Sequence, residues 1–448
     1  MPSVLNLQTQ DVDSEEKRAK YTVSIVGCGQ IGILYADAFA GAGYKVTCND
    51  ENPNLLKRLT KAKNCCINHE IETRLKKHID TGNLTTSSMR KNTVAQSDII
   101  VLAINIRMDA KKKSDTLELE GAYKQVGTAL KQGALLIYGG IGGFGSTETL
   151  LKETLENTSG LKEGKDFLLA YNPLHLPRTR PMKSLNNTEL IIASANQQSL
   201  DVATIVLKTL TSKVKQTNQV KLAELATLFK GAQQDTCMAL ANELAFFCEN
   251  TGMDYFKVQK LINDENSNFW PSIEGEENRK ETCLLIESAE NLNIKLRLPQ
   301  LSRQINEERV KYAINLTQEA LRSCDKSLRR SKVAVFGTSN QNTITAKYIE
   351  AATAKGAKVT LYELLLSKNE MVDTSPDLKR SLNETIEGAD CLVILIGQEQ
   401  FKRLNLKRLK TVMKKPAVLV DLIGITEPEK IQAEGFIYRG IGRGMDKL

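Results

Sequence analysis

A short segment near the start of the chain restricts the possible folds more than any other. Residues 21–26 are an apolar run, and GCGQIG (residues 27–32) follows directly. A helical pattern then extends to Gly43, and a second expected strand, residues 45–49, ends at Asp50. A strand, a glycine turn, a helix and another strand form a βαβ unit, because parallel strands need a crossover connection. The segment therefore predicts a parallel sheet covered by helices.

The same alternation continues and then returns near the C-terminus. In the first half, strands are expected at residues 98–104, 134–138, 167–171 and 189–193, with a helix near 119–130. In the last part, strands are expected at residues 332–337, 358–362, 389–396 and 417–422. Between them the periodicity is mostly helical, with residues 224–248 the longest segment. The fold class is α/β, with two Rossmann-like parallel-sheet domains joined by a helical central domain. The expected parts are a flexible leader (1–20), a first Rossmann domain (21–196), a helical domain (197–325) and a second Rossmann-like domain (326–448).

Composition excludes several other classes of protein. With 448 residues, 41% hydrophobic and 25% charged, the chain fits the soluble globular class, and no apolar run is long enough to span a membrane. The net charge of +8 is spread along the chain without an aromatic-interleaved basic run, which argues against a nucleic acid partner. The nine cysteines, an odd number, indicate reduced thiols in the cytoplasm. The three histidines are scattered, so no metal site is expected.

The glycine spacing predicts a dinucleotide site, because Gly27 allows the tight turn, Gly29 lets the backbone approach a pyrophosphate and Gly32 allows close helix packing. The helix that follows offers unpaired N–H groups to the phosphates. Asp50 would accept hydrogen bonds from ribose hydroxyls and repel a 2′-phosphate, which favours NAD over NADP. The residues expected to bind NAD are Gly27, Cys28, Gly29, Gln30, Ile31, Gly32, Asp50, Ala103 and Ile104. The alternative is a Rossmann domain that has lost its cofactor.

Several further stretches carry a family resemblance. They read VSIVGCGQIG, GNLTTSS followed by SDIIVLAI, SGLKEGKDFLLAYNP, MALANELAFFCENTGMD, GADCLVILIGQEQF and YRGIGRG. On these motifs the chain, from about residue 21 onward, resembles the UDP-glucose/GDP-mannose dehydrogenase family. Within it, the chain looks most like the UDP-N-acetylhexosamine dehydrogenases of archaea and bacteria. The resemblance implies NAD-dependent oxidation of a UDP-sugar alcohol to a uronate in two hydride transfers, a role in polysaccharide biosynthesis, and a homodimer formed through the central helices.

The resemblance also implies a set of reactive residues, and this chain departs from them. The register, anchored at Ala289 and Asn306, puts Glu277 on the position of the family's cysteine nucleophile and Glu281 on that of its aspartate. The remaining positions differ as well, with Thr227 for the lysine, Gly231 for the asparagine, Ile141 for the threonine and Leu174 for the glutamate. In the last domain, residues 338–343 lack the family's lysine and arginine, and Ile423 replaces the arginine of a D-x-R motif.

These substitutions change the expected chemistry. A thioester needs a thiolate, so the usual second oxidation is not expected with Glu277. A single hydride transfer remains conceivable with Glu277 or Glu281 as base, if burial raises the carboxyl pKa toward neutrality. The alternative is that both are solvated carboxylates, with Glu281 in the first turn of a helix. Cys283, with Glu287 at the cysteine-to-aspartate spacing, is an alternative nucleophile, although a structural thiol on a helix is the simpler interpretation.

Two functional hypotheses therefore stay open. The first is an NAD-dependent oxidoreductase acting on a UDP-sugar through a remodelled site. The second is a catalytically inactive relative that binds NAD and acts as a binding or regulatory partner. Measurement of NADH formation with UDP- and GDP-sugars distinguishes them.

Three further features bear on ligands and assembly. Arg178 and Arg180 could pair with the diphosphate of a nucleotide sugar. The glycine-rich residues 139–145 could let the backbone approach a ligand, or could be a flexible turn that fills the space of lost side chains. Within the helix at 224–248, Leu240, Leu244 and Phe247 lie along one apolar stripe, which is compatible with burial in a homodimer.

Overall fold

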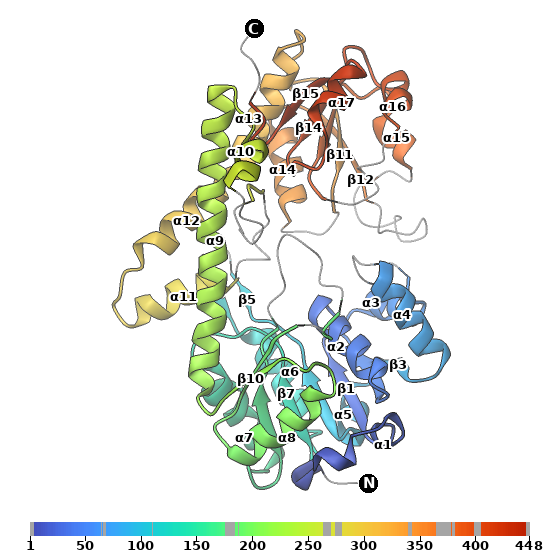
Figure 1. Ribbon diagram of the computed structural model, residues 1–448, viewed down its shortest axis with the longest axis vertical. Coiled ribbons are helices and arrows are strands. Elements are labelled where there is room, and N and C mark those ends of the chain that lie inside the picture. Colours follow the sequence, from blue (N-terminus) through green and yellow to red (C-terminus); the bar gives the residue numbers. More distant parts are fainter. Residues whose placement is uncertain are drawn as a thin grey trace. The chain divides into compact units, whose positions relative to one another are not determined.

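A computed structural model describes most of the chain, and Figure 1 shows its arrangement. The described residues are 4–63, 65, 69–109, 111–174, 184–186, 188–262, 270–273, 280–338, 343–363, 378, 381–397 and 405–444. The chain divides into two compact units. Unit 1 comprises residues 1–231 and 280–295, and unit 2 comprises residues 232–279 and 296–448.

Unit 1 is built around an eight-stranded sheet with the order β10-β9-β8-β7-β4-β1-β2-β3. Its strands are β1 (Thr22–Val26), β2 (Lys45–Asn49), β3 (Leu84–Ser87), β4 (Ile99–Leu102), β7 (Leu135–Tyr138), β8 (Leu168–Tyr171), β9 (Leu190–Ala193) and β10 (Val214–Thr217). A two-stranded hairpin, β5 (Arg107–Met108) and β6 (Ser114–Asp115), follows β4. All neighbouring strands of the large sheet are parallel except β8 and β9. The α/β fold class expected from the sequence is therefore confirmed for this unit.

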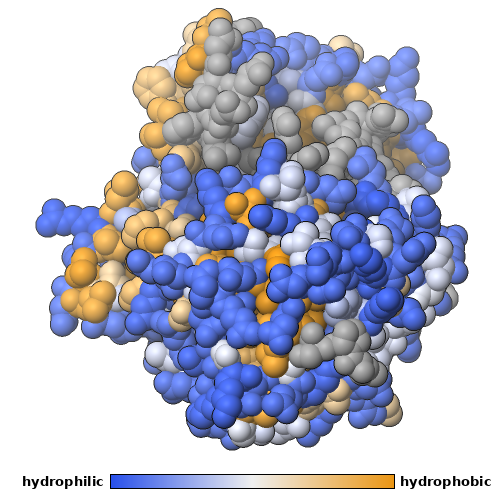
Figure 2. Space-filling view, turned by 60° about the horizontal axis from the view of Figure 1, so that its bottom comes forward, coloured by the Kyte–Doolittle hydropathy of each residue, from blue (hydrophilic) through white to orange (hydrophobic). Residues whose placement is uncertain are grey.

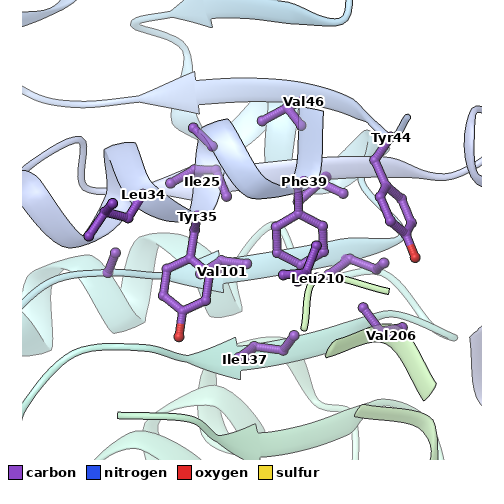
Figure 3. Packing of buried hydrophobic residues seen from close by; sticks show 14 of the residues in the cluster. Ile25, Leu34, Tyr35, Phe39, Tyr44, Val46, Val101, Ile137, Val206 and Leu210 are labelled. Carbon is purple, nitrogen blue, oxygen red and sulfur yellow. The ribbon is translucent and has the colours of Figure 1, made fainter. Parts of the chain in front are cut away.

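Helices lie along both faces of this sheet. They are α1 (Glu15–Arg18), α2 (Gln30–Gly41), α3 (Pro53–Thr60), α4 (His69–Asp80), α5 (Arg90–Gln96), α6 (Leu117–Gly127), α7 (Glu153–Ser159) and α8 (Gln197–Lys208), with π-helical residues Thr147–Lys152 before α7. Helix α11 (Lys280–Asn291) also belongs to unit 1 but lies beside α9, away from the sheet (Figure 1). On one face, Tyr35 and Phe39 of α2 pack over strand residues such as Ile25 and Val101 (Figure 3). The strands are rich in β-branched and aromatic residues, which suits a sheet buried on both faces.

The segment predicted to be a flexible leader is packed against unit 1. It forms two short 3-10 turns, Val4–Asn6 and Thr9–Asp11, before α1. Val4, Leu7 and Val12 are almost completely buried in the same core cluster as α2 and α8. The side-chain amide of Gln198 also donates to the Leu5 carbonyl at 2.6 Å. The few apolar residues of this polar segment are thus the ones that hold it in place.

Unit 2 contains a five-stranded parallel sheet with the order β12-β11-β13-β14-β15. Its strands are β11 (Lys332–Phe336), β12 (Lys358–Tyr362), β13 (Cys391–Ile394), β14 (Val418–Asp421) and β15 (Ile437–Gly440). Its helices are α10 (Tyr255–Ile262), α12 (Arg297–Glu307), α13 (Arg309–Arg322), α14 (Ile344–Ala354), α15 (Leu382–Ile386), α16 (Leu406–Val412) and α17 (Pro428–Ala433). The long helix α9 (Val220–Thr251) begins in unit 1 and ends in unit 2. Among the described helices, none combines the length and hydropathy needed to cross a bilayer.

Candidate functional site

The dinucleotide turn lies at the carboxyl end of β1, where the sheet order changes direction between β1 and β4. Ligands of open parallel sheets bind at this switch point. Gly27 has a φ of +92°, which favours glycine, and α2 begins at Gln30 directly after the turn. A Cβ added to Gly32 would lie 1.9 Å from the carbonyl oxygen of Gly27, so the helix can approach the turn this closely only without a side chain. Gly29 is exposed, and an added Cβ would meet nothing within 4 Å.

The other residues expected at the cofactor contribute in different ways. Cys28 and Ile31 are buried, so their side chains belong to the core and only their backbone can face a ligand. Gln30 is exposed at the first position of α2. Ala103 and Ile104 follow β4 directly, and both approach the position that a Cβ of Gly27 would take, at 2.9 Å and 2.8 Å. They therefore line the switch point beside the turn.

Asp50 follows β2 and turns its carboxylate toward the glycine turn. Its Oδ2 accepts a hydrogen bond from the backbone N–H of Cys28 at 2.7 Å, and its Oδ1 accepts one from Asn52 at 2.8 Å. A carboxylate has about four acceptor positions, so both oxygens can still accept from ribose hydroxyls. The turn, the start of α2 and this carboxylate fit a dinucleotide without a 2′-phosphate.

Residues 139–145 form an ordered, hydrogen-bonded loop after β7, rather than a loose turn. The N–H of Gly139 donates to the Leu102 carbonyl at 2.9 Å. The N–H of Ile141 donates to Oδ1 of Asn105 at 2.8 Å, and its carbonyl accepts from the N–H of Ile106 at 3.1 Å. The loop therefore runs along the segment that follows β4, beside the switch point.

Glu224 anchors the far end of this glycine loop, and sequence reasoning did not single it out. Its carboxylate accepts from the N–H of Gly145 at 2.6 Å and from that of Thr147 at 2.9 Å. Only 2% of Glu224 is exposed. Burial raises the pKa of this carboxyl, and the bonds from Thr147 and Gly145 oppose that shift. Glu224 looks like an ordinary helical glutamate in sequence, because its partners lie about 80 residues earlier and share no spacing with it.

Three of the substituted family positions lie among buried groups. Thr227, on α9, is 4% exposed, and its hydroxyl donates to the Ala223 carbonyl one turn earlier at 2.9 Å. Leu174 is 1% exposed and belongs to the core cluster of unit 1. Ile141 is buried within the glycine loop. Lys230, the neighbouring lysine on α9, is exposed, in line with its position on another side of the helix.

Two further substituted positions, Gly231 and Glu281, are in direct contact. A Cβ built on Gly231 would lie 2.3 Å from Cβ and 2.9 Å from Cγ of Glu281. Glu281 stands in the first turn of α11, as expected, but it is only 9% exposed. The interpretation of Glu281 as a solvated carboxylate is therefore wrong, because the missing side chain at Gly231 lets α11 pack directly against α9.

Helix α11 contacts other parts of unit 1 from its first turn to its last. Leu284, one turn after Glu281, lies 3.9 Å from the position of a Cβ on Gly143 in the glycine loop. Further along, Glu287 accepts from the N–H of Ser114 at 3.1 Å, and Glu290 pairs with Lys113 at 2.6 Å, both in the β5–β6 region. Cys283 lies about 200° around the helix from Glu281, so it does not share the face that carries Glu281 and Leu284.

Some expected residues lie elsewhere. Glu277, Arg178 and Arg180 lie outside the described residues. In unit 2, Asp421 of the D-x-R motif is fully buried at the end of β14. It accepts from the N–H of Gly424 at 2.8 Å and from the hydroxyl of Thr426 at 2.6 Å, so it shapes the loop in which Ile423 replaces the arginine.

Comparison with known proteins finds relatives for most of the chain. Models of the UDP-glucose/GDP-mannose dehydrogenase family match residues 21–211 (NAD binding domain), 221–308 (central domain) and 339–428 (UDP binding domain). The UDP-N-acetyl-D-mannosamine dehydrogenase of Pyrococcus horikoshii is 27% identical over 94% of this chain and 99% of its own length. Protein CapL of Staphylococcus aureus is 24% identical over 93% of this chain and 99% of its own.

Solved structures agree with these matches. A structure of the UDP-D-ManNAc dehydrogenase from Pyrococcus horikoshii has a TM-score of 0.77 at 26% identity, covering 94% of this chain and 99% of the other. The UDP-glucose dehydrogenase from Pyrobaculum islandicum has the same fold, with a TM-score of 0.77 at 20% identity over 94% of this chain and 98% of the other. The cofactor of the first Rossmann domain is NAD. The chain belongs to the UDP-glucose/GDP-mannose dehydrogenase family.

Proposed function

We propose that the protein is an NAD-dependent oxidoreductase that acts on the CH–OH group of a UDP-sugar of the N-acetylhexosamine type and transfers a single hydride. The similarity to UDP-N-acetyl-D-mannosamine dehydrogenases along nearly the full chain supports this substrate class. When bound, NAD accepts a hydride from the alcohol carbon. The expected limit of one hydride follows from the sequence, because Glu277 stands where a thiolate would capture the intermediate for a second oxidation.

One observation supports the proposal that this site has changed but still functions, in contrast to a site that has lost its function. The glycine turn and Asp50, which we propose hold the dinucleotide, are present in the sequence, while two substituted positions, Gly231 and Glu281, fit each other in space. Random loss of function would leave no reason for a glycine on α9 to lie against a buried carboxylate on α11. The alternative is a non-catalytic chain that binds NAD and acts as a partner of an active relative. This alternative holds if no sugar is oxidised.

Initial rates of NADH formation with UDP-N-acetylglucosamine, UDP-N-acetylmannosamine, UDP-N-acetylgalactosamine, UDP-glucose and GDP-mannose test the proposal. We expect turnover with at least one of the UDP-N-acetylhexosamines and none with GDP-mannose. NAD binding by calorimetry, measured on the same preparation, is the control for a folded site. If NAD binds and no UDP-sugar is oxidised, the protein is a non-catalytic relative and the proposal fails.

We further propose a homodimer in the cytoplasm, formed through the C-terminal part of α9. The expected stripe is exposed in the single chain, at 44% for Leu240, 42% for Leu244 and 65% for Phe247. Figure 2 shows hydrophobic residues, in orange, gathered on one side of the surface. A contiguous apolar surface of this kind marks an interaction site, and the family resemblance makes a second copy its occupant.

A charge in this stripe is expected to separate the dimer. In Phe247→Glu, a carboxylate would be buried without a partner at the interface, so light scattering should give the mass of one 49.7 kDa chain instead of two. Leu117→Glu is the matched control, because Leu117 is 77% exposed on α6, outside the stripe, and should leave the dimer intact. A wild-type protein that is monomeric at micromolar concentration would contradict the dimer.

We retain the three-part organisation as a proposal, with residues 21–196 holding NAD, residues 197–325 forming the dimer and residues 326–448 holding the nucleotide sugar. The match of the UDP binding domain to residues 339–428 supports the last assignment. Arg178 and Arg180 remain candidates for the diphosphate.

A further inference from the structure

Two adjacent carboxylates and a guanidinium lie at the edge of the sheet where β2 and β3 end. Asp50 and Glu51 follow β2 directly, and Arg90 is the first residue of α5, which comes after β3. Because β2 and β3 are parallel, their carboxyl ends share one edge of the sheet. The adenosine ribose of a dinucleotide lies at the residue that follows β2. Charges at this edge therefore act on the 2′ position, where NADP carries a phosphate and NAD a hydroxyl.

The guanidinium of Arg90 is held by two side chains. Its Nη1 lies 3.3 Å from Oε1 of Glu51 and donates a hydrogen bond to Oε1 of Gln125 at 3.0 Å. The side chain of Arg90 is only 9% exposed, whereas that of Glu51 is 65% exposed. A buried charge is costly without a partner, so the guanidinium depends on this carboxylate more than the solvated carboxylate depends on the guanidinium.

Hydrogen bonds fix the two segments that carry this ion pair. The hydroxyl of Thr93, three residues after Arg90 on α5, donates to Oδ1 of Asn49, the last residue of β2, at 2.7 Å. On the other side of Glu51, the N–H of Asn52 donates to Asp50 at 2.8 Å, and the Asn52 side chain caps α3. The backbone on both sides of Glu51 is thus anchored, and the start of α5 is tied to the end of β2.

The charge of Arg90 also acts on the glycine turn itself. A hydrogen bond with Cys48 and burial raise the pKa of the Cys28 thiol, the negative charge of Asp50 adds to this shift, and the guanidinium of Arg90 opposes it. Asp50 and Arg90 are therefore both close enough to influence Cys28, the second residue of the turn. Asp50 additionally accepts the hydrogen bond from the Cys28 N–H.

We propose that the ion pair of Glu51 with Arg90 sets the preference for NAD over NADP. An arginine beside the ribose is the usual partner of a 2′-phosphate, because its guanidinium matches the phosphate oxygens. Here Glu51 occupies and neutralises that guanidinium, which leaves the carboxylate of Asp50 to repel the phosphate. Glu51 and Arg90 are thus specificity-determining residues for the cofactor. This assignment concerns binding alone and does not depend on which sugar is oxidised.

The dissociation constants of NAD⁺ and NADP⁺, measured by calorimetry on the full chain, test the assignment, because their ratio isolates the effect of the 2′-phosphate. We expect Glu51→Gln to lower the ratio of the NADP⁺ constant to the NAD⁺ constant by about tenfold, as for a unit charge several ångström away at a partly exposed position. Arg90→Met should raise the ratio, because the carboxylate of Glu51 then repels the phosphate unopposed. An unchanged or higher ratio in Glu51→Gln would overturn the proposal.

Two controls separate the guanidinium from a general loss of negative charge. In an Arg90→Met background, Glu51→Gln removes repulsion without freeing a phosphate partner, so the ratio should fall by less than about threefold. An equal fall in both backgrounds would overturn the role of Arg90. Glu189→Gln removes an exposed carboxylate that pairs with Lys215 at 2.9 Å, at the strands β9 and β10 on the other side of the sheet. It should leave the ratio unchanged, and a fall as large as in Glu51→Gln would also contradict the proposal.

Folding is checked by urea unfolding, since Arg90 is buried. If Arg90→Met does not fold, Arg90→Lys replaces it as the second variant. The lysine keeps the charge but loses the planar fork that matches phosphate, so Glu51→Gln should lower the ratio less in the Arg90→Lys background than in the wild type. An equal fall would again overturn the role of Arg90. A wild-type protein that binds neither NAD⁺ nor NADP⁺ would overturn the dinucleotide site itself.

Discussion

A chain carrying Gly29→Ala is expected to fold with wild-type stability and to lose about tenfold or more in NAD affinity. Gly29 has φ −64°, which alanine adopts without strain, and an added Cβ would meet no protein atom within 4 Å. In the proposed dinucleotide site, this is the position at which the backbone approaches the pyrophosphate. The methyl group would therefore collide with bound NAD and with no part of the protein.

Gly32→Ala is the matched contrast. Its Cβ would lie 1.9 Å from the backbone oxygen of Gly27, so either α2 or the turn has to move. We expect a loss of about 1–3 kcal/mol in the free energy of unfolding, the usual cost of overpacking, together with loss of NAD binding. Urea unfolding and calorimetry with NAD measure the two effects. If Gly29→Ala bound NAD as tightly as the wild type, the glycine turn would not be the phosphate site.

The second large effect is expected for Gly231→Ala, which should change the free energy of unfolding in opposite directions in two backgrounds. In the wild type, Gly231→Ala places a Cβ 2.3 Å from that of Glu281, and we expect a loss of about 1–3 kcal/mol of unfolding free energy. In a Glu281→Gly background the obstacle is absent. There the same substitution should be neutral or stabilising, because alanine is favoured over glycine in a helix by about 1 kcal/mol.

A double-mutant cycle by urea unfolding measures this coupling. Lys230→Ala, at the exposed neighbour on α9, is the control and should be close to neutral in both backgrounds. Equal costs of Gly231→Ala in both backgrounds would show that the two substituted positions are independent. The two substitutions would then give no support to a remodelled site.

Local patterns predicted most of the strands of both sheets. The expected strands 45–49 and 358–362 agree with β2 and β12 residue for residue, because each begins shortly after a glycine and contains valine and threonine, which favour strands. The hydrophobic pattern did not predict that β9 runs antiparallel to β8, because this pattern does not depend on the direction of a strand in the sheet. It also predicted a free leader, whereas three apolar side chains hold that segment against unit 1.

For the candidate site, less could be predicted from the sequence than for the strands. The glycine turn is local, and its position at the end of β1 could be predicted from spacing. Glu224 and Glu281 act through contacts with residues far away in sequence, at Gly145 and Gly231. Such contacts depend on how α9 and α11 pack, and a single sequence carries no sign of helix packing at this level. In the sequence, Glu281 therefore looks like an ordinary carboxylate in the first turn of a helix. Its burial follows only from the packing of α11.

The most direct test of the central claim is the number of NADH molecules formed per sugar. A limiting amount of the UDP-N-acetylhexosamine that reacts is incubated with excess NAD until absorbance at the NADH band stops rising, and the product is identified by mass spectrometry. We predict one NADH per sugar and a carbonyl product, because the chain has no thiolate at the position of Glu277. Two NADH per sugar with a uronate product would contradict the account.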